Sequence, residues 1–192
     1  MFKKTLWIDT ETTGIEPGKH GIIQLAALMD IAGEVVDEFE LKFQPHPGAE
    51  INLEALAVTG TRPEELATRG TSADAYFEFV RWIGKHIDKY DRMDKAYPAA
   101  FNAHFDYQFL DAWFRLHGNG YGTGSYHNWR YQDPLALLRL LDYTGRLSLA
   151  DYKLGTACAH YGIELQAHDA LSDVRAARAL HVVLLGEIFK GQ

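Results

Sequence analysis

This sequence is nearly devoid of cysteine, since Cys158 is the only one among 192 residues. No disulfide can form within the chain, which favours a reducing compartment, and we expect a cytoplasmic location. Cys158 lies in the stretch G-T-A-C-A-H, where we expect a small buried helix residue and not a nucleophile. The scarcity of cysteine therefore excludes a disulfide scaffold as the fold class.

Long apolar runs are also missing. None approaches the ~20 residues that a membrane-spanning helix needs, so no membrane association is expected. Residues 1–4 lead directly into a strand pattern, without the apolar segment and cleavage site of a secretory signal peptide.

An excess of positive charge is the third absence, because the formal net charge is -7 at pH 7. This disfavours a protein that coats nucleic acid through bulk positive charge. It does not exclude an enzyme that grips a strand end through metal ions, because clustered acidic ligands would themselves make the sum negative. The net charge therefore does not decide whether the protein binds nucleic acid.

What is present is the composition of an ordinary globular protein, with 47% hydrophobic and 23% charged residues. The sequence shows no internal repeat, low-complexity tract or linker between domains. We therefore expect one domain over residues 1–192, long enough to bury a substantial core.

The stretch L-W-I-D-T-E-T-T-G at residues 6–14 is the part around which the rest is organised. If residues 6–11 form a β-strand, side chains alternate between its faces, and Asp9 and Glu11 project from the same side. Two such carboxylates at the end of a buried strand repel each other and lose hydration. Divalent cations that prefer oxygen ligands would offset both costs. A merely solvated Asp-x-Glu is the alternative, so the motif needs partners from elsewhere in the chain.

The remaining pattern predicts an α/β fold. Two further strands complete an antiparallel meander, and a buried strand follows much later, between helices. Thr61, with Glu64 three residues later, is expected to cap a short helix. The predicted fold class is a mixed central sheet flanked by helices, with carboxylates at strand ends and helix starts. The predicted strands are 22–31, 35–43 and 97–103, and the predicted helices are 52–58, one after 61, 72–90, one running to about 116, 135–142, 149–161 and 170–188.

Acidic side chains recur at two other boundaries between elements. Asp106 follows the buried strand in F-N-A-H-F-D, and Asp173 lies five residues after His168 in H-D-A-L-S-D. Each has an ordinary alternative. Asp106 could be a helix-start charge, His168 a surface or capping histidine, and Asp173 a solvated residue or the partner of a nearby arginine. These separate explanations account less well for the presence of all of these residues together in one chain.

In these three motifs the sequence resembles the DEDDh group of 3'→5' exonucleases. That group includes the proofreading subunit of bacterial DNA polymerase III, ribonuclease T and oligoribonuclease. The motifs of the group match D-T-E-T-T-G at 9–14, N-A-H-F-D at 102–106 and H-D-A-L-S-D at 168–173, in order and across nearly the whole chain. The resemblance implies a ribonuclease H-like exonuclease fold. It also implies the histidine branch of the superfamily, because the tyrosine branch has its base four residues before the last acid, where this chain has Asp169.

The resemblance further implies a metal-dependent mechanism. Two Mg²⁺ or Mn²⁺ ions would be held by Asp9, Glu11, Asp106 and Asp173, with Asp9 shared between both ions. Carboxylate and water ligands favour such hard ions over zinc. His168 would be the general base that takes a proton from the attacking water, a role suited to an imidazole with a pKa of about 6.5. These five residues are the predicted catalytic set.

The same resemblance implies contacts to the substrate. The backbone of Thr13 and Gly14 would hold the terminal nucleotide, and Ile15 and Phe105 would pack against terminal bases. A core role for Phe105 is equally compatible with the sequence. The predicted substrate-binding residues are Thr12, Thr13, Gly14, Ile15, Asn102 and Phe105.

The glycine-rich stretch 117–128, followed by Trp129, Arg130 and Tyr131, is expected to be a loop. Aromatic residues interleaved with arginine could contact a single strand or a dimer partner, although a surface connection is the simpler interpretation. A DNA polymerase and a second copy of this chain are the candidate protein partners. No clamp-binding tail is recognisable at the end of the sequence.

We therefore expect a metal-dependent exonuclease that releases nucleoside 5'-monophosphates from the 3' end of DNA, with single strands as the expected form. An exoribonuclease that trims RNA 3' ends is the alternative, because the sequence does not reveal how the ribose 2'-OH is treated. A non-catalytic module with the same fold is a third hypothesis, against which the intact acids and His168 argue. Proofreading as a polymerase subunit and stand-alone trimming both fit the sequence.

Overall fold

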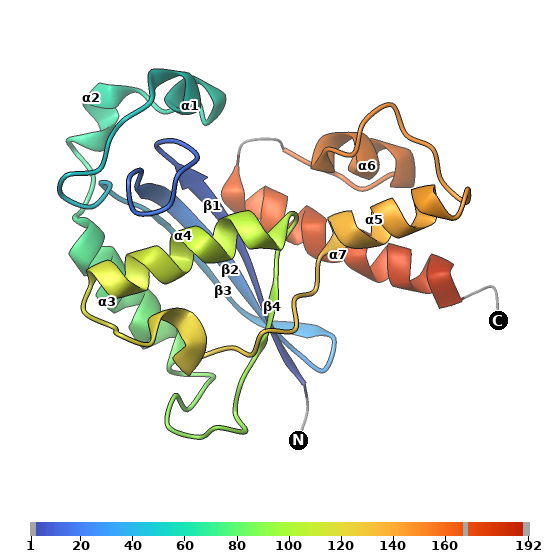
Figure 1. The fold of residues 1–192 in the computed structure, drawn as a ribbon, viewed down its shortest axis with the longest axis horizontal. Coiled ribbons are helices and arrows are strands. Elements are labelled where there is room, and N and C mark those ends of the chain that lie inside the picture. Colours follow the sequence, from blue (N-terminus) through green and yellow to red (C-terminus); the bar gives the residue numbers. More distant parts are fainter. Residues whose placement is uncertain (1–2, 167–168, 190–192) are drawn as a thin grey trace.

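The computed structural model describes residues 3–166 and 169–189, and a four-stranded sheet lies at its centre (Figure 1). The strand order is β3-β2-β1-β4, in which β2 is antiparallel to both β1 and β3, and β4 is parallel to β1. The predicted meander and mixed sheet are therefore confirmed. The strands are β1 (Lys4–Thr12), β2 (Ile22–Ile31), β3 (Glu34–Lys42) and β4 (Tyr97–Ala99), and the helices are α1 (Leu53–Val58), α2 (Pro63–Leu66), α3 (Ser72–Ile83), α4 (Ala103–Leu116), the short 3-10 helix η1 (Gly122–Ser125), α5 (Pro134–Tyr143), α6 (Leu154–Tyr161) and α7 (Ala170–Phe189).

Alternation along β1 divides its side chains between two cores. Leu6 and Ile8 are buried on one face in a cluster with residues of α3 and α4. Trp7 points to the opposite face and packs with Ala170 and other residues at the start of α7. Helices α5 and α6 pack in turn against α7 (Figure 1). Since Asp9 and Glu11 share the face of Trp7, the geometry of β1 directs them toward α7.

Two of the predicted helices are shorter than expected. The apolar spacing predicted a helix over 72–90, but α3 ends at Ile83, where Gly84 caps it by donating to the carbonyl oxygens of Val80 and Trp82. Ile87 is nevertheless buried, so the periodic burial continues beyond the last helical turn. The helix predicted over 149–161 begins only at Leu154. Asp151 accepts hydrogen bonds from the Lys153 backbone and the Thr156 hydroxyl, which fixes an extended entry into α6.

Three local predictions also need correction. Arg62, not Thr61, is the N-cap of α2, because Pro63 at the first helical position already fixes the entry and Arg62 hydrogen-bonds to Glu65. Strand β4 ends at Ala99 instead of residue 103, since Asn102 adopts a left-handed conformation with φ of 63°. The loop 117–128 contains the 3-10 helix η1.

Cys158 is buried in α6, as predicted, and burial raises the pKa of its thiol to about 11. This protonated thiol is a packing residue and not a nucleophile. Within residues 3–166 and 169–189, no helix has both the length and the apolar character needed to cross a membrane.

Candidate active site

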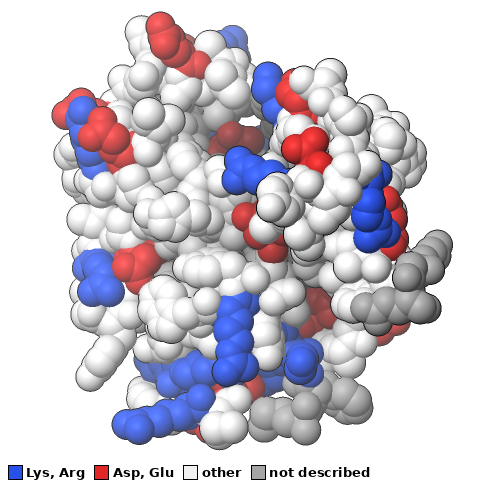
Figure 2. Space-filling model, turned by 45° about the vertical axis from the view of Figure 1, so that its right-hand side comes forward, with Lys and Arg blue, Asp and Glu red and all other residues white. Residues whose placement is uncertain are grey.

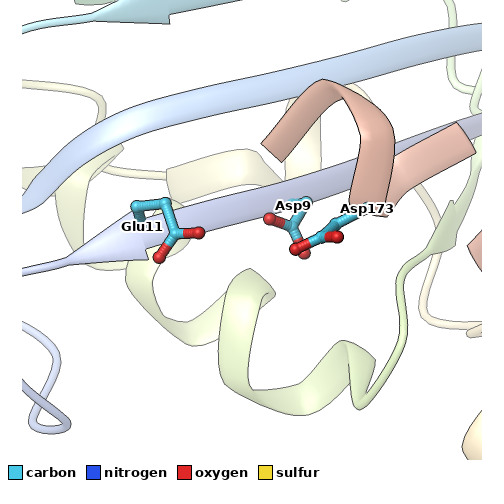
Figure 3. A group of neighbouring side chains, drawn as sticks. All are labelled: Asp9, Glu11 and Asp173. Atoms are coloured by element: carbon cyan, nitrogen blue, oxygen red, sulfur yellow. The ribbon is translucent and has the colours of Figure 1, made fainter. Parts of the chain in front are cut away.

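Three predicted metal ligands meet on the α7 side of the sheet. One carboxylate oxygen from each of Asp9, Glu11 and Asp173 lies within 4.8 Å of the other two. Figure 3 shows Asp9 and Asp173 facing each other, with Glu11 farther along β1 and turned to the same side. All three side chains are half-buried. Residues separated by more than 160 positions in the sequence thus form one cluster, here called the carboxylate cluster.

The position of Asp173 follows from how α7 begins. Asp169 accepts a hydrogen bond from the Ser172 backbone at 2.8 Å, and the Asp173 backbone donates to the Asp169 carbonyl at 2.8 Å. This first turn lies against the sheet because Ala170 and Val174 are fully buried beside Trp7. The small Ala170 side chain allows the helix to approach β1 closely, and Asp173 is thereby directed at Asp9.

Asp106 approaches β1 from the first turn of α4. Its Oδ1 accepts hydrogen bonds from the Thr10 backbone at 2.9 Å and from the Thr10 hydroxyl at 2.7 Å. The side chain is only 4% exposed. Asp106 is not among the carboxylates within 4.8 Å of each other, so its role as a metal ligand stays a prediction.

The electrostatics of these acids favour a bound cation. Burial, and then the charges of Asp106, Glu11 and Asp173, raise the pKa of Asp9 well above its usual range. Burial also raises the pKa of Asp106 to about 7, although the hydrogen bonds from Thr10 act in the opposite direction. Because so many acids cannot all ionise in a buried site without counter-charge, the donor set fits hard divalent cations with oxygen ligands.

The predicted pH dependence of stability follows from the raised pKa of Asp106. A carboxyl whose pKa is about 7 in the folded chain and ~3.9 in the unfolded chain binds more protons when folded, so the free energy of unfolding falls between these pH values. In EDTA, we expect the midpoint of thermal unfolding to fall as pH rises from about 4 to 7, and to fall less in Asp106→Asn. An equal slope in both proteins, measured by circular dichroism, would contradict this prediction.

The turn after β1 is rigid and exposes one apolar side chain. Thr13 is fully buried, and its hydroxyl donates to the Glu50 carbonyl while accepting from the Gly21 backbone. A Cβ atom at Gly14 would lie 2.2 Å from the His20 ring, so glycine is required there for close packing.

Ile15 follows and is 78% exposed. The Thr12 hydroxyl donates to the Gly14 carbonyl at 2.6 Å, which closes the turn. The sequence did not indicate His20, because its contact depends on the path of the loop between β1 and β2.

The two other predicted substrate residues lie at the start of α4. Asn102 is exposed and adopts the left-handed conformation at the N-cap. Phe105 is half-buried and its ring centre lies 5.0 Å from that of Phe109. Phe105 packs against the core cluster, which supports a role in the hydrophobic core. Its contact with a base of the substrate stays a prediction.

Asp133 is a positioning residue that sequence reasoning missed. Its Oδ1 accepts from the backbones of Asn102 at 3.0 Å and Leu135 at 2.9 Å, and its Oδ2 accepts from the Ala103 backbone at 3.1 Å. One carboxylate therefore joins the N-termini of α4 and α5. The apolar pattern predicted a helix over 135–142, but nothing in the sequence indicated the link to α4.

We expect Asp133→Ala to lower the free energy of unfolding by about 1–3 kcal/mol, because three backbone donors lose their acceptor. Asp133→Asn should lose less, since its amide oxygen can still accept. Urea denaturation in EDTA would measure both effects without interference from metal binding. An alanine variant as stable as the parent would refute the role.

The fold and the comparisons with known proteins are those of a DEDDh-type 3'→5' exonuclease, within the ribonuclease H-like superfamily. The sequence model of the exonuclease family matches residues 6–180, and the chain belongs to that family.

Similar curated proteins include the PolC-type DNA polymerase III of Thermotoga maritima, 29% identical over 88% of this chain, and that of Oceanobacillus iheyensis, 31% identical over 88%. The chain spans only 11% and 10% of these relatives. Escherichia coli exonuclease I, solved in complex with a dT13 oligonucleotide, has a TM-score of 0.79 and 21% identity. That match covers 98% of this chain and 43% of exonuclease I, and it confirms the fold.

The predicted general base, His168, lies outside the described residues. Asp169 and Asp173 of the same motif are described: Asp169 directly precedes α7, and Asp173 belongs to the carboxylate cluster. The catalytic role of His168 stays a prediction.

Proposed function

We propose that this chain hydrolyses the terminal phosphodiester bond at the 3' end of single-stranded DNA and releases nucleoside 5'-monophosphates. The observation that carries the proposal is the carboxylate cluster, in which three acids from two distant segments lie within 4.8 Å of one another. The acids of such a cluster can all ionise near neutral pH only with counter-charge, and phosphodiester hydrolysis is the chemistry that this charge serves in the family.

We assign the cations to Asp9, Glu11 and Asp173, with Asp106 as the fourth ligand through the oxygen that Thr10 does not occupy. Two Mg²⁺ or Mn²⁺ ions would supply Lewis-acid stabilisation of the phosphate and lower the pKa of the attacking water. His168 would take the proton of that water as general base.

The chain's own residues orient the strand end. The rigid turn at Thr12, Thr13 and Gly14 lies directly after the ligands of β1, and the exposed Ile15 offers an apolar surface to a terminal base. Phe105 and Asn102 lie at the start of α4, one turn or less from Asp106. Apolar contacts of this kind are tolerant of base identity, which suits a trimming enzyme.

DNA is the substrate that the comparisons favour. The similar curated proteins are DNA polymerases, and the exonuclease I structure with TM-score 0.79 holds a dT13 oligonucleotide. The resemblance to PolC-type polymerases also supports a second proposal, in which the chain acts as a proofreading partner of a polymerase. Co-purification with a polymerase and faster removal of mismatched 3' ends would support it.

Digestion of oligonucleotides labelled at the 5' end tests the main proposal directly. With Mg²⁺ we expect a ladder that shortens from the 3' end of DNA, and with EDTA we expect no digestion, because the acids alone cannot activate water. An RNA oligomer of the same sequence should be cut at a lower rate. Equal digestion in EDTA would contradict the metal mechanism. Faster digestion of the RNA oligomer would show that RNA, and not DNA, is the preferred substrate.

A further inference from the structure

Thr10 lies between the two acids that β1 contributes to the carboxylate cluster. Since side chains alternate along a strand, the Thr10 side chain projects to the face opposite Asp9 and Glu11. Thr10 is nevertheless buried, with only 7% of its surface exposed. A buried hydroxyl lowers stability unless it is hydrogen-bonded, so its partner indicates why a polar residue stands at this position.

The partner of Thr10 is Asp106. Oδ1 of Asp106 accepts a hydrogen bond from the Thr10 hydroxyl at 2.7 Å and another from the Thr10 backbone at 2.9 Å. Strand β4 pairs with β1 only as far as Ala99 opposite Trp7, so within the described residues it does not reach the level of Thr10. The carboxyl of Asp106 therefore occupies the edge of β1 beyond the end of β4, and two donors that meet at one oxygen fix its orientation.

Helix α4 has its own attachment to the sheet at this point. The hydroxyl of Tyr107, which follows Asp106, donates to the Leu6 carbonyl at 2.6 Å and accepts from the Ala99 backbone at 3.2 Å. Tyr107 is fully buried between these two strands and the helix. Because this contact holds the first turn of α4 in place, the Thr10 hydroxyl is left to control the orientation of the Asp106 carboxyl.

The donors that hold Asp106 carry no charge. Within residues 3–166 and 169–189, Asp106 takes part in no ion pair. Figure 2 shows many Lys and Arg side chains gathered at the lower end of the molecule, the end at which Figure 1 places the N-terminus. A cationic partner would neutralise the carboxylate and compete with a metal ion for it. A hydroxyl orients the carboxylate and leaves its negative charge for the metal.

We propose that Thr10 is a positioning residue, which holds Oδ1 of Asp106 so that Oδ2 is presented for metal binding. This role rests on the proposed exonuclease function, because it concerns the cations of that same site. Strand β1 would then serve the site twice, directly through Asp9 and Glu11 and indirectly through Thr10. Loss of a hydrogen-bond partner of a metal ligand typically weakens metal binding or activity about 10–100-fold.

Calorimetric titration of the full chain with Mn²⁺ alone, in the absence of DNA, tests this role without turnover. Thr10→Val keeps the shape of the side chain but lacks the hydroxyl, and we expect it to bind Mn²⁺ about 10–100-fold more weakly than the parent. Thr10→Ser keeps the donor and should restore most of the affinity. The matched control is Thr5→Val, the same change on the same strand, which should bind Mn²⁺ like the parent. Circular dichroism in EDTA should show that all three variants are folded.

A double-mutant cycle tests whether Thr10 acts through Asp106. Thr10→Val should weaken Mn²⁺ binding in the parent but not in Asp106→Ala, because the hydroxyl then has no carboxyl to orient. An equal loss in both backgrounds would overturn the proposal. So would parent-like binding by Thr10→Val, or failure of Thr10→Ser to restore binding.

Digestion of a labelled DNA oligomer by the same variants distinguishes failure of this role from failure of the proposed function. If the parent digests DNA while Thr10→Val matches it in both Mn²⁺ affinity and rate, the positioning role fails and the exonuclease function stands. If Mn²⁺ binding depends on Thr10 and Asp106 as expected but the parent does not digest DNA, the exonuclease function fails and the positioning role stands.

Discussion

Asp9→Ala is expected to reduce 3'-end digestion at least about 10³-fold, the scale reached when a group that stabilises transition-state charge is removed. Asp9 lies at the centre of the carboxylate cluster, and its pKa is raised by burial and by three neighbouring acids. Removing this side chain removes the proposed shared ligand of both cations. The measurement is single-turnover digestion of a labelled DNA oligomer over a range of Mg²⁺ concentrations.

The fold of Asp9→Ala should survive, because the substitution removes an acid that is strained by burial and repulsion in the absence of metal. We expect its thermal midpoint in EDTA to be no lower than that of the parent, and Mg²⁺ to stabilise the parent more than the variant. Glu78→Ala, which removes an exposed carboxylate from α3, is the control and should leave digestion unchanged. Full activity of Asp9→Ala in Mg²⁺ would refute the assignment.

The sequence predicted the β1 part of this site from local physics. Alternation along a strand places Asp9 and Glu11 on one face wherever the strand lies, so no knowledge of the fold was needed. That Asp173 joins them depends on how α7 crosses β1 over Trp7 and Ala170. This crossing could be expected only from the resemblance of the three motifs to a known family.

Contacts between distant segments account for what the sequence did not indicate. The bonds from Thr10 to Asp106 and from the Asn102 and Ala103 backbones to Asp133 connect residues 30 to 96 positions apart. The contact of the His20 ring with Gly14 is local, but it depends on the path of the loop between β1 and β2, which the spacing of residues does not reveal. Pattern alone therefore identified the acids but not the residues that position them.

The end of α3 illustrates a different limit. Ile83 and Ile87 continue one apolar periodicity, and both are buried, yet the helix stops between them at Gly84. Burial periodicity reports which residues face the core, and it does not report where the backbone stops being helical. The residues of the core were thus predicted correctly while the element that holds the last of them was not.

Without an acceptor for its proton, a metal-bound water can attack only slowly at neutral pH, so the general base should be the second most sensitive residue. The sequence offers one candidate, because His168 precedes Asp173 by five residues in the third motif. Imidazole has an unperturbed pKa of about 6.5, which makes it largely neutral and able to accept a proton at pH 7.5. The carboxylates, by contrast, are the proposed metal ligands.

We therefore expect His168→Ala to digest DNA about 10²–10⁴-fold more slowly than the parent, with a smaller effect on the Mg²⁺ concentration required. In the parent, the rate should rise with pH as the imidazole loses its proton, and this rise should disappear in the variant. His160→Ala, which removes an exposed histidine from α6, is the matched control and should keep both the rate and the pH profile. If His168→Ala retained the parent's rate across the pH range, another group would have to be the base.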